Sequence, residues 1–128
     1  MTILDSNIWI AFFNKNDNQH RKASLIFSKM KDAILITEYI ILEVCTVLAM
    51  RVNKKIADDF LEIVLHNQAV QVLSSSSDFF HKSVGNFLDY KHKDLSFVDI
   101  SLLNLAEKHE LLTFDKELEK ANKTINYC

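Results

Sequence analysis

The sequence contains no proline and a single glycine, Gly85, in 128 residues. Collagen-like, proline-rich and glycine/serine-linker sequences need many of these two residues, so these classes are excluded. Phosphate-binding loops of the G-x-G-x-x-G and G-x-x-x-x-G-K-[ST] types are excluded because each needs more than one glycine. If this protein handles phosphate groups, it does so without a glycine-rich loop.

Cysteine, charge of one sign and long apolar runs are scarce as well. Cys45 lies in an apolar run and Cys128 is the last residue, which is typical of a reducing compartment rather than of a disulfide framework. Fifteen Lys and Arg stand against 17 Asp and Glu, so the chain is not a polycation. The first residues contain no basic region or apolar signal core, and no run of about 18 apolar residues occurs. We expect a cytoplasmic protein without a membrane segment.

The length and the hydrophobic content of 48% predict a single domain over residues 1–128. Short apolar runs, which favour buried strands, alternate with longer stretches of helical spacing. The expected strands are Thr2–Leu4, Ala33–Thr37, Val70–Leu73, Leu111–Phe114 and Thr124–Tyr127. The expected helices are Ser6–Phe13, His20–Lys31, Glu38–Met50, Asn53–Asn67, Ser76–Asp89, Ser96–His109 and Asp115–Ala121. This alternation predicts a three-layer α/β/α domain with a central parallel sheet of about five strands, whose carboxyl ends are where function gathers.

Two aspartates stand at strand ends. Asp5 follows the apolar run Thr2–Leu4 directly, and Asp115 closes Leu111–Phe114 in the same way. Each also precedes an expected helix, so each alone could be an N-cap and nothing more.

Two further acids fall at helical positions. Glu43 is the only charged residue between Tyr39 and Met50, and a carboxylate beside an apolar face needs a cation or a hydrogen-bonded partner. The alternative is a glutamate at a helix edge that reaches water. Asp99 follows Ser96 by three residues, which matches a capping box, and it opens a largely apolar helix.

Together, these four acids converge on one edge of the predicted sheet. Mg²⁺ and Mn²⁺ prefer such all-oxygen clusters, with water and substrate phosphate completing the coordination. A cation held there would activate water for attack on phosphorus, which is the chemistry of phosphodiester hydrolysis. We expect Asp5, Asp99 and Asp115 to bind the cation directly, and Glu43 to complete the cluster or hold a water.

The segments around these acids resemble the motifs of the PIN-domain family, particularly the small VapC-type ribonuclease toxins of toxin–antitoxin modules. The four segments agree with the family in order and spacing over essentially the whole chain. They are Ile3-Leu4-Asp5-Ser6-Asn7, Ile41-Leu42-Glu43-Val44, Leu95-Ser96-Phe97-Val98-Asp99 and Leu112-Thr113-Phe114-Asp115-Lys116. Each motif alone is weak, whereas the ordered set is fairly specific.

The resemblance implies an endoribonuclease that depends on Mg²⁺ or Mn²⁺, with the four acids as its catalytic set. Asn7 matches the polar position that orients the acidic network in the family, and Ser96 and Thr113, in the third and fourth motifs, are assigned the same kind of role. It also implies a homodimer and a cognate antitoxin protein whose tail covers the active-site groove.

Basic residues near the motifs are candidates for binding RNA phosphates, although solvated surface charges are the alternative for each. They are Arg51, Lys54, Lys91, Lys93 and Lys116.

Two other classes of function stay open. A phosphotransfer or phosphatase-type enzyme also needs an aspartate at a strand end as its nucleophile. Asn7 stands against a dehalogenase-type phosphatase, because it occupies the place of the general acid in the Asp-x-Asp motif. A non-catalytic PIN-like binding module would keep the acids only as helix caps.

Overall fold

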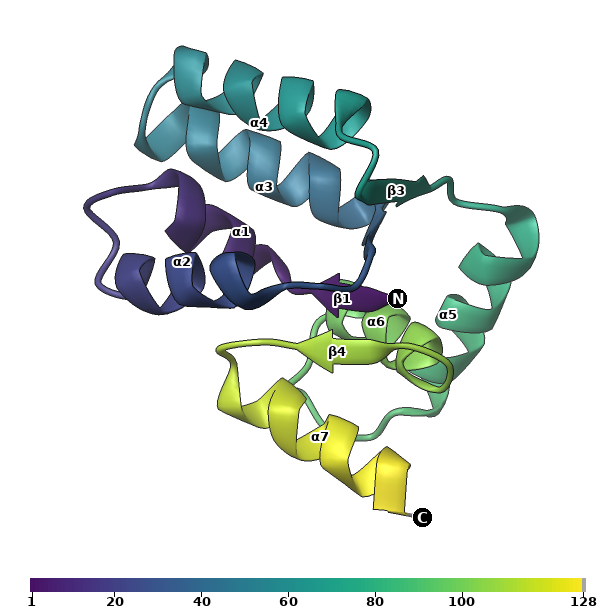
Figure 1. Ribbon diagram of the computed structural model, residues 1–128. Coiled ribbons are helices and arrows are strands. Elements are labelled where there is room, and N and C mark those ends of the chain that lie inside the picture. The colour runs from purple at the N-terminus through teal and green to yellow at the C-terminus, as the bar shows by residue number, and fades with distance from the viewer. Residues whose placement is uncertain (128) are drawn as a thin grey trace.

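The computed structural model describes residues 1–127, with side chains described for residues 1–124, and Cys128 lies outside the described residues. Strands and helices alternate along the chain (Figure 1). The strands are β1 (Thr2–Leu4), β2 (Ile34–Thr37), β3 (Val70–Leu73) and β4 (Glu110–Leu112). The helices are α1 (Ser6–Phe13), α2 (His20–Lys29), α3 (Glu38–Arg51), α4 (Lys54–His66), α5 (Ser77–Asp89), α6 (Phe97–Ala106) and α7 (Lys116–Tyr127).

The strands form one parallel sheet in the order β3-β2-β1-β4. Thr2 of β1 pairs with Ile34 on one side and with Glu110 on the other. The chain therefore moves outwards from β1 to β2 and β3, and then returns to the opposite side of β1 for β4. The direction of winding reverses between β1 and β4, and such a reversal opens a crevice at the carboxyl ends of the strands.

The crossover connections determine which helices cover each face of the sheet. Crossovers between parallel strands are right-handed in almost all proteins, so α1–α4 cover one face and the crossover α5–α6 covers the other. In Figure 1, α1–α4 gather on one side of the strands and α6 and α7 on the other. This arrangement confirms the predicted α/β architecture with a parallel sheet. None of the helices within residues 1–127 is long and apolar enough to cross a membrane.

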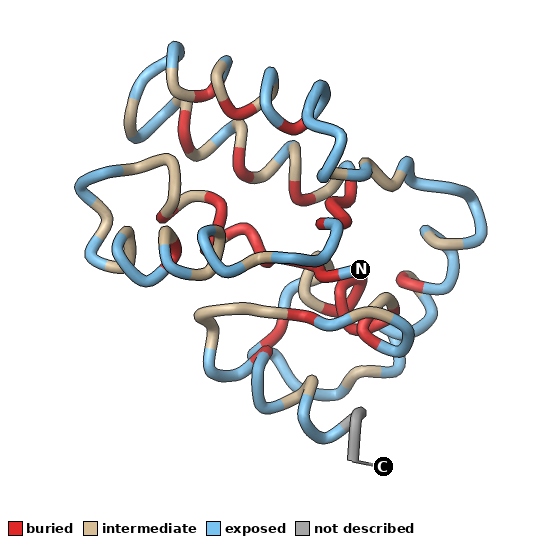
Figure 2. Tube along the Cα trace, in the orientation of Figure 1, coloured by how far each residue is buried: buried red, intermediate tan, exposed pale blue. Residues whose placement is uncertain are grey.

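The buried core runs along β1 and β2 and into the helices that flank them (Figure 2). Every residue of β1 and β2 is buried, and apart from Thr2 and Thr37 all are apolar, so neither strand shows the alternation of a strand with one exposed face. The largest fully buried side chains include Trp9 of α1, Phe60 of α4 and Leu102 of α6. Trp9 and Leu102 thus anchor α1 and α6 in the core, which fixes each helix against the sheet.

The end of the chain differs from the sequence-based expectation. The predicted strand Thr124–Tyr127 is helical, so α7 is longer than expected and the described sheet has four strands rather than about five. The helix continues because Thr124 donates a hydrogen bond to the carbonyl of Lys120, and Lys123 pairs with Glu119 one turn earlier.

The last strand also ends earlier than expected, at Leu112 instead of Phe114. The backbone N–H of Phe114 donates to the side-chain oxygen of Asn7 instead of joining the ladder of the sheet. Asp115 is consequently the third residue after the strand, separated from it by Thr113 and Phe114, rather than directly at its end. The other elements agree with their predicted bounds to within three residues, including α4 with its predicted N-cap, Asn53.

Candidate active site

Asp5 lies at the centre of the carboxyl edge of the sheet, and its side chain is only 4% exposed. As the N-cap of α1 it accepts a hydrogen bond at Oδ1 from the backbone N–H of Ser6, at 2.7 Å. Its Oδ2 accepts from the hydroxyl of Thr113 at 2.7 Å and from the amide of Asn7 at 3.3 Å. Both oxygens are therefore fixed by groups from the two strand ends that flank the reversal of winding.

The pKa of the Asp5 carboxyl is raised to about 6 from the usual 3.8. Burial is the main cause, and the negative charges of Asp99 and Glu43 add to it, whereas the hydrogen bonds from Thr113 and Ser6 work in the opposite direction. No Lys or Arg within residues 1–124 forms an ion pair with Asp5. Its ionised form thus carries a charge that the described side chains do not balance.

Glu43 lies on α3, is half-buried, and has Ser6 as its partner. The hydroxyl of Ser6 donates to Oε1 of Glu43 and lies 3.5 Å from Oδ1 of Asp5. The partner that the sequence predicted for Glu43 is therefore a hydroxyl group, not a cation. The role of Ser6 was not predicted from the sequence, although its position directly after Asp5 indicates a place beside the acids.

Asp99 lies in the first turn of α6 and forms the predicted capping box with Ser96. Ser96 Oγ accepts from the backbone N–H of Asp99 at 3.1 Å, and the backbone N–H of Ser96 donates to Oδ2 of Asp99 at 2.9 Å. Burial raises the pKa of Asp99, and the nearby charge of Asp115 raises it further. The second oxygen of Asp99, Oδ1, accepts no hydrogen bond from the part of the chain that the structure describes.

Asp115 precedes α7, where its Oδ1 accepts from the backbone N–H groups of Glu117 at 2.8 Å and Leu118 at 3.3 Å. Thr113 orients this segment, because its Oγ1 accepts from the backbone N–H of Asp115 at 3.0 Å and also from Asn7 at 3.2 Å. One hydroxyl group thus links the loop after β4 to the carboxylate of Asp5.

The structure brings the four predicted acids into one electrostatic neighbourhood. Asp5 interacts with both Glu43 and Asp99, and Asp99 interacts with Asp115. Over the described residues, no three His, Cys, Asp or Glu side chains already stand in the arrangement of a metal site. Carboxylates repel one another, and a bound cation is what would draw them together. The donors are all oxygens and include a buried carboxylate without a counter-charge, so the residues fit a hard divalent cation.

The predicted phosphate-binding cations are distributed around this edge and beyond it. Lys91 and Lys93 lie in the exposed segment between α5 and α6, and Lys116 is the first residue of α7, next to Asp115. Arg51 ends α3, about 12 Å along the helix axis from Glu43 at 1.5 Å per residue. Lys54, at the start of α4, pairs with Asp58 at 2.5 Å.

A further cation near the site was missed from the sequence. Lys22 of α2 lies over the ring of Phe114, with its Nζ 5.3 Å from the ring centre. Phe114 in turn donates its backbone N–H to Asn7, so Lys22 stands close to the loop that holds the acids. No sequence pattern links positions 22 and 114, because the contact depends on how α2 folds back against the end of β4.

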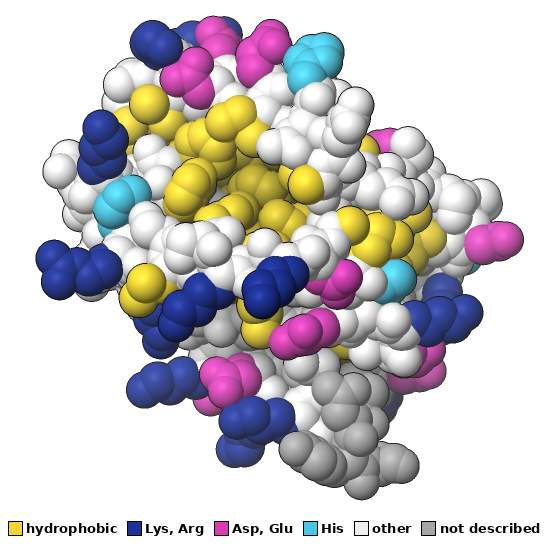
Figure 3. All heavy atoms as spheres, in the orientation of Figure 1, with side chains coloured by type: hydrophobic (Ala, Val, Ile, Leu, Met, Phe, Trp, Pro, Cys, Tyr) yellow, Lys and Arg dark blue, Asp and Glu magenta, His cyan; other side chains and the backbone are white. Residues whose placement is uncertain are grey.

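An aromatic hollow occupies a different part of the surface. Figure 3 shows hydrophobic side chains gathered in a hollow over the region of α1, α2 and α4. A cavity of about 280 Å³ there is lined by Trp9, Phe12, Phe13, Phe27, Ile34, Ile63, Asn67, Ala69 and Val70. Trp9 is fully buried, and its ring packs edge-on against Phe27 and Phe60. These contacts identify Trp9 as a core residue.

Comparisons with known proteins agree with this geometry. A family model described as PIN domain matches residues 2–124. Among solved structures, the crystal structure of VapC20 from Mycobacterium tuberculosis, a toxin described as cleaving the sarcin-ricin loop, superposes with a TM-score of 0.86. The two sequences are 19% identical, and the match covers 94% of this chain and 95% of that chain, so the likeness is one of fold. A search of curated proteins finds no match.

Proposed function

The chain belongs to the PIN-domain family, as its four sequence motifs predicted, and we propose that it is an endoribonuclease that hydrolyses RNA phosphodiester bonds with Mg²⁺ or Mn²⁺. The observation that carries this proposal is the buried Asp5 carboxylate, which faces two other carboxylates without a balancing cation. A folded protein retains such an arrangement at a cost in stability, and perturbed carboxylates of this kind are typical of functional sites.

The four acids have distinct roles in the proposed site. Asp5, Asp99 and Asp115 would hold the cation directly, and Glu43 would complete the set or hold the attacking water. A bound divalent cation supplies positive charge at the phosphate and makes water a stronger nucleophile at neutral pH. Ser6 positions Glu43 through its hydroxyl group, and Asn7 and Thr113 keep Asp5 in one orientation.

Three helices begin at this edge, which supports binding of a phosphate group. The N-termini of α1, α6 and α7 lie next to Asp5, Asp99 and Asp115, respectively. A helix N-terminus carries a partial positive charge, which attracts phosphate oxygens even where caps occupy some of its backbone N–H groups. Lys91, Lys93 and Lys116 lie nearby and are exposed, and we propose that they bind flanking phosphates of the RNA.

The geometry disfavours Asp5 as the nucleophile of a phosphotransfer through an aspartyl phosphate. Both oxygens of Asp5 are held by hydrogen bonds, from Ser6 and from Thr113, so attack by either oxygen would cost one of these bonds. A non-catalytic module that keeps its acids only as caps would not need Glu43, which caps no helix and is nevertheless paired with Ser6.

The test compares two aspartates that both lie in the first turn of a helix. Asp99→Asn keeps an oxygen to accept from Ser96 and removes the charge, so the variant should fold while RNA cleavage falls at least about 100-fold. Asp78→Asn, the matched control, changes an exposed aspartate of α5 outside the acid cluster and should cleave like the wild type. Cleavage is measured with Mg²⁺, with Mn²⁺ and with EDTA. Equal rates for the two variants, or cleavage that persists in EDTA, would refute the proposal.

We further propose that the chain is a cytoplasmic toxin of a toxin–antitoxin module, acting as one PIN-like domain over residues 1–128. Exposed apolar side chains on α3 and α5 support the expected homodimer, because Leu42 is 67% exposed, Leu88 73% and Phe80 44%. Light scattering on wild type and on Leu42→Glu tests the dimer, which the charged variant should dissociate.

An antitoxin encoded immediately upstream should suppress cleavage when it is co-purified with the chain, whereas a solitary gene would contradict the toxin assignment.

A further inference from the structure

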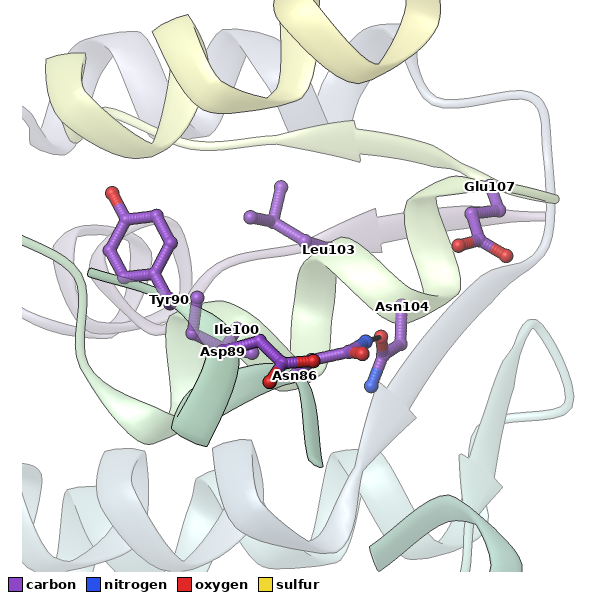
Figure 4. A pocket seen from close by; sticks show the side chains of 7 residues that line it. All are labelled: Asn86, Asp89, Tyr90, Ile100, Leu103, Asn104 and Glu107. Atoms are coloured by element: carbon purple, nitrogen blue, oxygen red, sulfur yellow. Dashed lines mark hydrogen bonds between the residues drawn. The ribbon is translucent and has the colours of Figure 1, made fainter. Parts of the chain in front are cut away.

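A pocket lies between α5 and α6 and extends along α6 from Ile100, next to Asp99, to Glu107. It has a volume of about 280 Å³ and is lined by Asn86, Asp89, Tyr90, Ile100, Leu103, Asn104 and Glu107 (Figure 4). Ile100 directly follows Asp99 along α6, and the phenol of Tyr90 is close enough to Asp99 for their charges to interact. The pocket is therefore within reach of an RNA strand whose phosphate occupies the acidic centre.

The wall of this pocket is held by hydrogen-bonded polar side chains, of which Ser83 and Asn104 are buried and Asn86 is exposed. Asn104, which is 9% exposed, donates from Nδ2 to the hydroxyl of fully buried Ser83 at 2.9 Å. Its Oδ1 accepts from Nδ2 of Asn86, and Figure 4 shows these two amides meeting between the helices. Buried amides with satisfied hydrogen bonds hold one orientation. The network thus fixes the side chain of Asn86 at the mouth of the pocket.

The remaining polar groups of the pocket are mainly hydrogen-bond acceptors. Asp89 and Glu107 contribute carboxylates, and the Oδ1 of Asn86 accepts nothing from the described residues. The hydroxyl of Tyr90 donates to Asp94 at 2.7 Å, which leaves its oxygen able only to accept. Glu107 pairs with Lys82 at 3.4 Å but is half exposed, so its second oxygen stays available. A phosphate is repelled here, and a group that presents several N–H donors is favoured.

The volume of the pocket and its apolar side chains suit a ligand of small size. Ile100 and Leu103 line one side, and the ring of Tyr90 closes one end of the pocket in Figure 4. Pockets for drug-sized molecules measure about 300–1,000 Å³, so a volume at the lower limit suits a single ring system. Unpaired RNA bases are read through stacking on aromatic rings and through hydrogen bonds along their Watson–Crick edges.

From these contacts we infer that the α5–α6 pocket binds one unpaired base of the RNA substrate and prefers guanine. Guanine presents an imino N–H and an amino group side by side, which match the two oxygens of a carboxylate. Uracil presents one imino N–H between two carbonyl oxygens, and those oxygens would face Asp89 or Glu107. The inference rests on the proposed ribonuclease function and adds a base preference to it.

The experiment reads the base preference without assuming where the base lies relative to the cut. Single-stranded RNA of random sequence is cleaved with Mn²⁺ by the full chain, and the ends of the products are sequenced. The value of kcat/KM is then measured on two RNAs that differ only in guanine or uracil at the preferred position. The test variant is Asp89→Asn with Glu107→Gln. The control, Asp78→Asn with Glu110→Gln, removes two exposed carboxylates elsewhere on the surface.

We expect wild type and control to favour guanine about tenfold or more, and the test variant to cleave both RNAs within about twofold of each other. Cleavage with no base preference, or with a preference that the test variant retains, would overturn the inference and leave the ribonuclease proposal intact. If wild type cleaves no RNA, the ribonuclease proposal fails. Anisotropy of two labelled single-stranded RNAs of equal length, one with guanine and one with uracil at every second position, then decides the inference separately, because equal binding of the guanine and uracil forms would overturn it.

Discussion

Replacing Asp5 by asparagine tests whether the buried carboxylate carries an unbalanced charge. Asp5 is 4% exposed, and its pKa is raised to about 6 by burial and by the charges of Asp99 and Glu43. Between pH 3.8 and about 6, the folded protein holds a proton that the unfolded chain has released. The free energy of unfolding therefore falls as the pH rises through this window, and it falls no further above it.

The magnitude follows from the two pKa values. A rise from 3.8 to about 6 corresponds to about 3 kcal/mol, at about 1.4 kcal/mol for each tenfold change in proton affinity. Asparagine has no proton to lose, so the variant lacks this part of the pH dependence. The hydrogen bonds that asparagine makes or loses add an offset that does not vary with pH. At pH 4 the unfolded chain is already largely ionised at this residue, so the difference in stability between Asp5→Asn and wild type should shift by about 2.5 kcal/mol in favour of the variant between pH 4 and pH 7.5.

The assay is thermal unfolding of both proteins at several pH values in EDTA. For a chain of 128 residues the expected change is about 10 °C in the difference between the two melting temperatures, at about 4 °C per kcal/mol. Mn²⁺ at about 100 times its dissociation constant should stabilise wild type at pH 7.5 by about 3 kcal/mol and leave Asp5→Asn unchanged. Parallel curves for the two proteins across the pH range would refute the assignment of an unbalanced charge to Asp5.

Three further predictions concern the groups around Asp5. Ser6→Ala removes the partner of Glu43, and we expect cleavage to fall about tenfold and the free energy of unfolding by about 1 kcal/mol, measured by steady-state kinetics and urea titration. Thr113→Val removes a hydrogen bond that lowers the pKa of Asp5, so the acid limb of the pH–rate profile should move to higher pH. Lys91→Ala with Lys93→Ala should weaken RNA binding at low salt and reduce its salt dependence by about 1.4 in log–log slope, at about 0.7 per phosphate contact.

The sequence predicted the parts of the fold that depend on local pattern. Thr2–Leu4 is a continuous apolar run and forms a strand that is buried on both faces, with the acid directly after it. Asn53 and Ser96 start helices because their side chains accept from backbone N–H groups three residues later. Such signals are contained in a few neighbouring residues, and they also located all four acids of the candidate site.

The sequence did not predict features that depend on contacts between distant segments. Leu111–Phe114 reads as one strand, but Asn7, more than 100 residues away, takes the backbone N–H of Phe114 and ends the strand at Leu112. The hydrogen bond from Thr113 to Asp5 forms because the strand ends before Thr113. The contact of Lys22 with Phe114 forms because α2 folds back toward the segment after β4. A short segment such as Thr124–Tyr127 suits a strand or a helix equally well by its sequence pattern. Contacts between successive turns of α7, such as the ion pair of Lys123 with Glu119, favour the helix.

Helix capping and cation binding do not compete at this site, because a carboxylate has two oxygens. Asp99 caps with Oδ2 and Asp115 with Oδ1, and in the described part of the chain the second oxygen of each accepts no hydrogen bond. A cap fixes the carboxylate at a helix N-terminus, and three such termini meet where the winding of the sheet reverses. An aspartate at the start of a helix on this edge therefore shows the residue pattern of an ordinary cap, whether or not it also binds a cation. The residue that distinguishes a functional cluster from a set of caps is Glu43. It caps no helix, and the hydroxyl of Ser6 nevertheless connects it to Asp5 by hydrogen bonds.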